Sequence, residues 1–305
     1  MTTSFIADIA SYQHGLQLAT LRPDCVGVEI KCTEGGTYVN PDYAGWLTQA
    51  RAAGLLTIAY HYIDGSSPAA QAANLKAHIG DTALPVMLDV EKGSGDLANA
   101  LAVADAMTAA GLRPKLMYLP RWYWEQIGSP PLAAPFAQRA LVLINADYPT
   151  TSPGSPAGLY PGDSSSLWDG YGGIAAPTFL QFTASAVEGG MQVDMNAFRG
   201  TAEQLAAMLG TAGPPPPQAP PWPGRTFVYS GPGTAVTQGD DVRRWQAKMA
   251  ERGWRITADG WYGPLSAGVC TAFQQDSTAH GWPLAVDGKV GQLTWRATWE
   301  RPVSR

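Results

Sequence analysis

Residues 85–91 read PVMLDVE, a short apolar run that ends in two carboxylates. In a β-strand, side chains at positions i and i+2 point to the same face, so Met87, Asp89 and Glu91 share one face. If that face lines a β/α barrel, both acids lie at the carboxyl end of the strand, where barrel enzymes place their catalytic groups. The alternative is a strand end that carries two solvated acids.

Two acids at one site have a defined chemical use. Their mutual repulsion raises the pKa of one group, which can then keep a proton as a general acid while the other stays ionised. Asp8 closes the apolar run of residues 5–10, and Asp194 lies in the extended segment 193–196. A single Asp after an apolar run is more often a turn or a helix cap. Four acids at strand ends instead predict one shared site, and hydrolysis of a glycosidic bond requires two carboxyl roles.

The first two hundred residues alternate short apolar runs with alanine-rich segments. Strands are expected at residues 5–10, 25–32, 56–63, 83–91, 115–119, 141–148 and 178–183, and helices at residues 43–53, 68–79 and 97–110. Continuous apolar strands separated by helices are typical of a parallel sheet covered on both faces. We predict an α/β fold, an irregular TIM-like (β/α) barrel with few helices, because the long Gly-, Pro- and Ser-rich stretch 149–177 departs from a regular barrel.

Aromatic side chains lie at the ends of several expected strands. Tyr60, Tyr62 and Tyr118 could stack on the faces of sugar rings, although most aromatic residues are simply part of a core. His61 has no Ser or Cys nucleophile motif such as GxSxG near it, and we interpret it as a hydrogen-bonded core histidine.

A proline-rich segment divides the chain. Residues 210–224 read GTAGPPPPQAPPWPG, and prolines on this scale exclude a helix or a central strand. We expect a catalytic domain at residues 1–209, a semi-rigid linker at residues 210–224 and a second domain at residues 225–305.

The second domain is expected to be a small all-α module. One helix would bury Val242, Trp245 and Met249, and a second apolar stripe consists of Leu265, Val269 and Phe273. The segment 259–263 (DGWYG) returns 28 residues later as 287–291 (DGKVG), which indicates duplicated helix-loop units.

Charge and cysteine content limit the partners and cofactors. Residues 1–224 carry 10 basic and 18 acidic side chains and residues 225–305 carry 10 and 7, so the two parts have formal charges of −8 and +3. A basic module is attracted to anionic polymers, either a cell wall or a nucleic acid. Cys25, Cys32 and Cys270 have no metal-ligand spacing, so we expect reduced thiols, no metal and no cofactor.

Five segments of the first part resemble, in order, the family 25 glycoside hydrolases, the lysozymes of phage endolysins and bacterial autolysins. They are residues 8–13 (DIASYQ), 29–35 (EIKCTEG), 59–62 (AYHY), 85–91 (PVMLDVE) and 193–196 (VDMN). The resemblance covers about residues 5–209 and implies an irregular barrel with few helices.

The resemblance also implies roles for individual residues. The proton donor of that family corresponds to Glu91, and the acid that orients the acetamido group of the substrate corresponds to Asp89. Asp8 and Asp194 match supporting acids, and Glu34 matches a family position near the cleft. The substrate-binding residues we expect are Glu34, Tyr60, Tyr62, Tyr118 and Gln181.

Residues 237–299 resemble the peptidoglycan-binding module of the first common type (PG_binding_1). The similar segments are residues 239–243 (GDDVR), 245–246 (WQ), 259–263, 273–274 (FQ) and 287–291. A module of this type would hold a catalytic domain close to its polymer.

Together these features predict an endolysin-type lysozyme, an N-acetylmuramidase that cuts the β-1,4 bond between N-acetylmuramic acid and N-acetylglucosamine. The alternatives are a non-catalytic wall-binding protein and a chitinase-like hydrolase. The expected partner is bacterial peptidoglycan, with no nucleic acid, no membrane insertion and a monomeric state. Residues 1–5 lack the features of a secretory signal, so we expect synthesis in the host cytoplasm and holin-dependent access to the wall.

Overall fold

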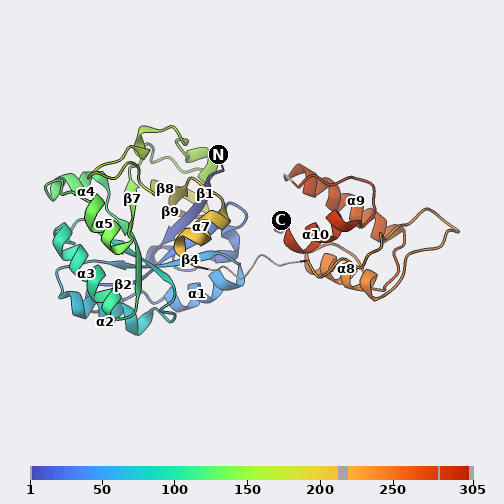
Figure 1. The fold of residues 1–305 in the computed structure, drawn as a ribbon, viewed down its shortest axis with the longest axis horizontal. Helices are drawn as coiled ribbons and strands as arrows, with labels where there is room; N and C mark the ends of the chain where they lie inside the picture. Colours follow the sequence, from blue (N-terminus) through green and yellow to red (C-terminus); the bar gives the residue numbers. More distant parts are fainter. Residues whose placement is uncertain (1, 212–218, 281, 302–305) are drawn as a thin grey trace. The chain divides into compact units, whose positions relative to one another are not determined.

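The computed structural model describes residues 2–211, 219–280 and 282–301 (Figure 1). The chain divides into two compact units, Met1–Ala212 and Gly213–Arg305. Of the linker predicted at residues 210–224, residues 212–218 lie outside the described residues. Within the described ranges, no helix has the combination of length and apolar character that a membrane crossing requires.

The first unit is built on a closed ring of eight strands. Seven consecutive pairings order them as β1-β9-β8-β7-β6-β5-β4-β2, and a further pairing of β1 with β2 closes the ring. The strands are β1 (Ser4–Ile9), β2 (Cys25–Glu34), β4 (Leu56–Tyr62), β5 (Pro85–Asp89), β6 (Arg113–Tyr118), β7 (Val142–Ala146), β8 (Phe179–Glu188) and β9 (Met191–Phe198), with the short β3 (Tyr38–Val39) added to the edge of β2.

The ring departs from a regular barrel in one place. Within the ring, β1, β2, β4, β5, β6, β7 and β8 pair in parallel with one another, whereas β9 pairs antiparallel with both β8 and β1. Two residues join β8 to β9, so a hairpin stands where a regular barrel would have a helix. The predicted irregular α/β barrel is therefore confirmed.

Helices lie outside the ring of strands (Figure 1). Those expected from the sequence are α1 (Tyr43–Ala52), α2 (Pro68–His78) and α3 (Leu97–Ala109), each one residue shorter than predicted. The unit also contains α4 (Arg121–Gln126), α5 (Ala133–Arg139), α6 (Pro156–Leu159) and α7 (Ala202–Leu209), which were not predicted. Within residues 149–177 the only helical pieces are α6 and a 3₁₀ turn at Ser166–Trp168.

Two apolar clusters hold the barrel together. The larger one lies between the strands and the outer helices and includes Val86, Leu88 and Val103. The smaller one fills the interior and includes Ile58, Met87 and other inward-facing strand residues. Leu205 and Leu209 of α7 belong to this inner cluster. Arg113, at the start of β6, donates to the Leu209 carbonyl, which places α7 at the amino-terminal end of the strands. The opposite end, where the strands finish, is left for a pocket.

The second unit contains α8 (Asp240–Glu251), α9 (Pro264–Ala279) and α10 (Gln292–Glu300) around an aromatic core. Trp222 contacts the rings of Phe227 and Trp295, and Trp295 donates to the Pro220 carbonyl, so the last residues of the proline-rich segment pack on this unit.

Two glutamines explain the 28-residue repeat of the second unit. Gln246 donates to Asp259 and to the Trp261 carbonyl, and its own side-chain oxygen accepts from the Gly260 amide at 2.8 Å. Gln274 makes the same three contacts with Asp287, Lys289 and Gly288. Each Asp-Gly turn is therefore held by a buried glutamine 13 residues before it.

One expected apolar stripe is partly wrong. Val269 and Phe273 of α9 are buried as predicted, but Leu265 is 60% exposed. Residues four apart rotate by about 40° around a helix, so the three-residue stripe drifts off the buried face. The buried face instead follows Ser266, Cys270 and Phe273.

Candidate functional site

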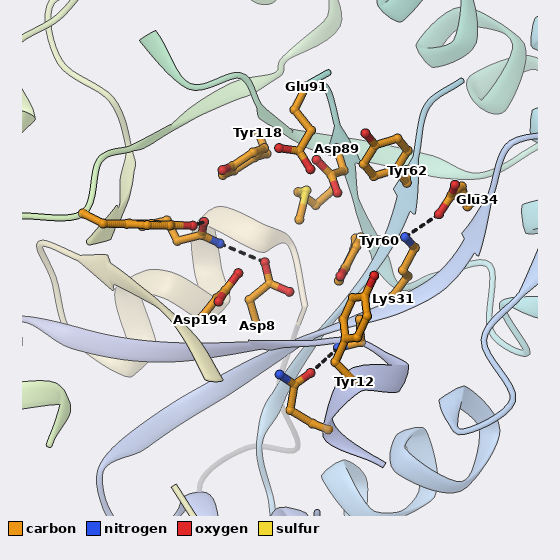
Figure 2. A pocket seen from close by; sticks show the side chains of 15 residues that line it. Asp8, Tyr12, Lys31, Glu34, Tyr60, Tyr62, Asp89, Glu91, Tyr118 and Asp194 are labelled. Carbon is orange, nitrogen blue, oxygen red and sulfur yellow. Dashed lines mark hydrogen bonds and ion pairs between the residues drawn. The ribbon is translucent and has the colours of Figure 1, made fainter. Parts of the chain in front are cut away.

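A pocket of about 450 Å³ opens at the carboxyl ends of the barrel strands (Figure 2). Every site residue predicted from the sequence lines it. These are Asp8, Glu34, Tyr60, Tyr62, Asp89, Glu91, Tyr118, Gln181 and Asp194. Six further residues also line the pocket, namely Ala10, Tyr12, Gln13, Lys31, Met87 and Tyr148.

The strand register brings the acids together. Asp8 of β1 pairs with Asp194 of β9, and Asp89 of β5 pairs with Tyr62 on one side and Tyr118 on the other. Glu91 follows two residues after Asp89 and shares its face. Figure 2 shows Asp89 and Glu91 side by side, with Asp8 and Asp194 facing them across the pocket.

The carboxyl groups perturb one another. Burial, followed by the nearby Glu91, raises the pKa of Asp89 well above its ordinary value. Burial also raises the pKa of Glu91, and burial together with Glu91 raises the pKa of Asp194 to about 6. Burial and the charges of Glu29, Asp194 and Asp89 raise the pKa of Asp8. Burial and mutual repulsion thus favour the protonated forms of the acids in the pocket.

Among the acids that line the pocket, Asp89 has a buried oxygen atom without a hydrogen-bond partner. Oδ1 of Asp89 is buried and has no partner among the described residues. A buried carboxylate oxygen without a donor is costly, so a ligand with an N–H or O–H group at this position would be favoured.

Lys31 balances part of the negative charge. Its Nζ lies 2.6 Å from Glu34 Oε2 and 4.7 Å from the centre of the Tyr62 ring. The Lys31 charge lowers the pKa values of Asp8, Asp89 and Glu91, which opposes the effect of burial. We did not predict Lys31 as a site residue, although it lies two positions from Glu29 and three from Glu34 in one quoted motif.

Tyr148 and Gln181 orient Asp8. The Tyr148 hydroxyl donates to Gln181 Oε1 at 2.5 Å, and Gln181 Nε2 donates to Asp8 Oδ2 at 3.0 Å. With its amide oxygen occupied by the tyrosine, Gln181 presents its N–H group to Asp8. We did not predict a site role for Tyr148; its position at the end of the expected strand 141–148 was the available signal.

Other candidates lie elsewhere. His61 is buried, with Nδ1 2.8 Å from Thr33 Oγ1 and Nε2 3.0 Å from Gln71 Oε1, and burial lowers its pKa to about 4. The interpretation of His61 as a core histidine is confirmed. Trp122 and Trp124, two further aromatics past a strand end, do not line the pocket. No group of His, Cys, Asp and Glu suited to a metal ion occurs in the described part of the chain.

The barrel unit is similar to known proteins. Residues 7–158 match the model of the glycosyl hydrolases family 25. The chain is 27% identical over 198 residues to "Lysozyme M1" of Streptomyces globisporus, an alignment that covers 59% of this chain and 62% of the lysozyme. This chain thus spans less than two thirds of that protein's length.

Solved structures give the same fold. A muramidase from Trichobolus zukalii superposes with a TM-score of 0.55 at 26% identity, covering 68% of this chain and 98% of the muramidase. A bacterial lysozyme from Streptomyces coelicolor gives a TM-score of 0.53 at 23% identity, covering 70% of this chain and 100% of the lysozyme.

A closed α/β barrel with paired acids at the strand ends, set beside these relatives, defines a glycoside hydrolase. The chain carries a domain of the glycosyl hydrolases family 25.

Replacing Lys31 by Met removes the counter-charge of the pocket. Because Lys31 lowers the pKa values of Asp89 and Glu91, we expect both groups to hold protons to higher pH in the variant. The pH optimum of kcat/KM for glycoside hydrolysis should rise by on the order of one unit. Lys31→Arg keeps the charge and should keep the optimum, whereas an unchanged optimum in Lys31→Met would contradict this role.

Proposed function

We propose that this protein is a lysozyme, an N-acetylmuramidase that hydrolyses the β-1,4 bond between N-acetylmuramic acid and N-acetylglucosamine in bacterial peptidoglycan. The observation that carries the proposal is the Asp89–Glu91 pair at the carboxyl end of β5, in a pocket lined by tyrosines. Relatives described as a lysozyme and a muramidase support this choice of substrate.

Glu91 acts as the general acid. It lines the pocket, and burial raises its pKa, which favours the protonated form that a general acid needs. Glu91 gives this proton to the glycosidic oxygen as the bond to the anomeric carbon breaks, which avoids the release of an alkoxide.

Asp89 orients the acetamido group of the substrate. Its unpartnered Oδ1 accepts a hydrogen bond from the acetamido N–H, which the buried carboxylate otherwise lacks. The acetamido oxygen then attacks the anomeric carbon and forms a cyclic intermediate. A water molecule, which loses a proton to the Glu91 carboxylate, opens this ring, so the configuration at the anomeric carbon is retained.

Asp8 and Asp194 support this reaction from the opposite wall. Held by Gln181, Asp8 faces the pocket as an acceptor for hydroxyl groups or for positive charge that develops at the anomeric carbon. Tyr60, Tyr62 and Tyr118 supply flat rings along the same pocket for contact with sugar faces.

Substituting Glu91 by Gln removes the transferable proton and keeps the shape of the side chain. We expect the release of muropeptides that end in reducing N-acetylmuramic acid to fall by about 10²–10⁴-fold, measured by mass spectrometry of digested peptidoglycan. Glu125→Gln, on the exposed surface of α4, is the matched control and should digest like the wild type. Near-normal digestion by Glu91→Gln, or wild-type cleavage of chitin oligomers but not of peptidoglycan, would contradict the assignment.

The second unit is proposed to bind the cell wall. Support comes from its formal charge of +3, its duplicated Asp-Gly turns and its resemblance to peptidoglycan-binding modules. Such a module raises the concentration of the barrel at the polymer without adding catalytic contacts. The phage endolysin role stays a prediction from the sequence.

Deleting the second unit tests this proposal. In a Glu91→Gln background, a chain that ends at Thr211 should sediment with purified peptidoglycan roughly tenfold less than the full chain. Circular dichroism would verify that the truncated chain is folded. Equal sedimentation of both chains would assign wall binding to the barrel alone.

A further inference from the structure

A second carboxyl–amide pair lies directly beneath the pocket. Glu29 of β2 and Asn196 of β9 are both fully buried, and Asn196 Nδ2 donates to Glu29 Oε2 at 2.9 Å. Glu29 lies two residues before the pocket residue Lys31, and Asn196 lies two residues beyond the pocket residue Asp194 on a strand that runs the opposite way. Both side chains therefore point into the barrel one step deeper than the pocket.

Two atoms of this pair have no hydrogen-bond partner. Glu29 Oε1 and Asn196 Oδ1 are both buried, and neither has a partner among the described residues. If Glu29 were ionised, both atoms would be acceptors without a donor, in an interior where an unpaired acceptor and a poorly solvated charge are costly. A single proton on Glu29 Oε1 turns that atom into a donor, and the Asn196 carbonyl oxygen is an acceptor for it. One proton thus gives the two unpartnered atoms complementary roles, a donor on Glu29 and an acceptor on Asn196.

The surroundings of Glu29 favour the same state. Asp8 is paired directly with Glu29 in the β1–β2 ladder. The charge of Glu29 raises the pKa values of Asp8 and of Tyr60 on β4. Asp194 of β9 and Lys31, two residues farther along β2, also act on Asp8. Burial raises the pKa of Glu29 to about 8, and the hydrogen bond from Asn196 opposes this only in part.

We propose that Glu29 is a protonated positioning residue, which forms a neutral acid–amide pair with Asn196 and supports Asp8 from below. Asp8 and Glu29 are neighbours in the β1–β2 ladder. Asp8 faces the pocket and accepts a hydrogen bond from Gln181, so we place the proton on Glu29. A neutral Glu29 removes one of the charges that, after burial, raise the pKa of Asp8, and so favours the ionised form of Asp8 in the proposed glycosidase site.

Infrared difference spectroscopy of the full-length protein tests the protonation state directly. Glu29→Gln keeps the shape of the side chain, and its amide N–H replaces the acid O–H toward Asn196. At pH 6 the wild type minus Glu29→Gln spectrum should contain the C=O band of a protonated carboxyl group, which disappears as the pH rises through about 8. Glu125→Gln, which removes an exposed carboxyl group, should lose only carboxylate bands. A loss of carboxylate bands alone in Glu29→Gln would overturn the proposal, whether or not the protein cuts peptidoglycan.

Stability gives a second measurement with a defined sign. The folded protein holds the Glu29 proton up to about pH 8, whereas the unfolded chain releases it near the ordinary value of 4.5. This contribution is fully present below pH 4.5 and is lost as the pH rises to about 8. The melting temperature of Glu29→Gln should therefore rise relative to the wild type between pH 5 and pH 9, and parallel curves would contradict the proposal.

Activity tests the positioning role. Above pH 8 the ionised Glu29 of the wild type repels Asp8, so the ratio of kcat/KM for Glu29→Gln over wild type should increase as the pH rises through about 8. A ratio that does not change with pH would refute an action through Asp8. Glu29→Leu, which cannot pair with Asn196, should lose the activity that Glu29→Gln keeps.

Discussion

The closure of the barrel forces the side chains at the ends of its strands into one small pocket, where five carboxyl groups must coexist. Like charges that are partly buried repel one another strongly, because little water screens them. The pocket is therefore stable only if some of its acids are neutralised. Three features reduce this repulsion. Lys31 supplies a positive charge beside Glu34, and Gln181 donates a hydrogen bond to Asp8. Burial raises the pKa values of Asp89, Glu91 and Asp194, which favours their neutral forms.

The crowding of carboxyl groups in the pocket also suits the hydrolysis of a glycosidic bond. A hydrolase of glycosides needs one acid that holds a proton and another that stays available as an acceptor. Asp89 at the end of β5 and Glu91 two residues later both line the pocket, but Asp89 is more deeply buried and its Oδ1 lacks a partner among the described residues. The pocket is therefore prepared for a substrate that brings its own N–H group, and an acetamido sugar has one.

The barrel and its acids were largely predictable because both follow from short-range patterns. Apolar strand runs, a two-residue spacing and acids at strand ends place Asp89 and Glu91 in the pocket before any tertiary contact is known. The helices α4 and α5 were missed because both are short; α4 is rich in aromatic residues, and α5 has a proline in its interior.

Residues whose role depends on closure of the ring could not be predicted. Lys31 reads as half of a local pair with Glu34 until β4 places the Tyr62 ring against it. Glu29 reads as one acid in a motif until the antiparallel β9 brings Asn196 to it from 167 positions away. In the second unit, the Asp-Gly repeat and the glutamines of the WQ and FQ segments were visible, but the hydrogen bonds by which Gln246 and Gln274 hold each turn were not.

The most direct test of this account is the anomeric configuration of the first product, followed by proton NMR during digestion of a soluble peptidoglycan oligomer. The account assigns proton donation to Glu91 and orientation of the acetamido nucleophile to Asp89, so the β-anomer of the new reducing end should form first and then equilibrate. Initial formation of the α-anomer would mean that water attacks directly, and would contradict the role given to Asp89.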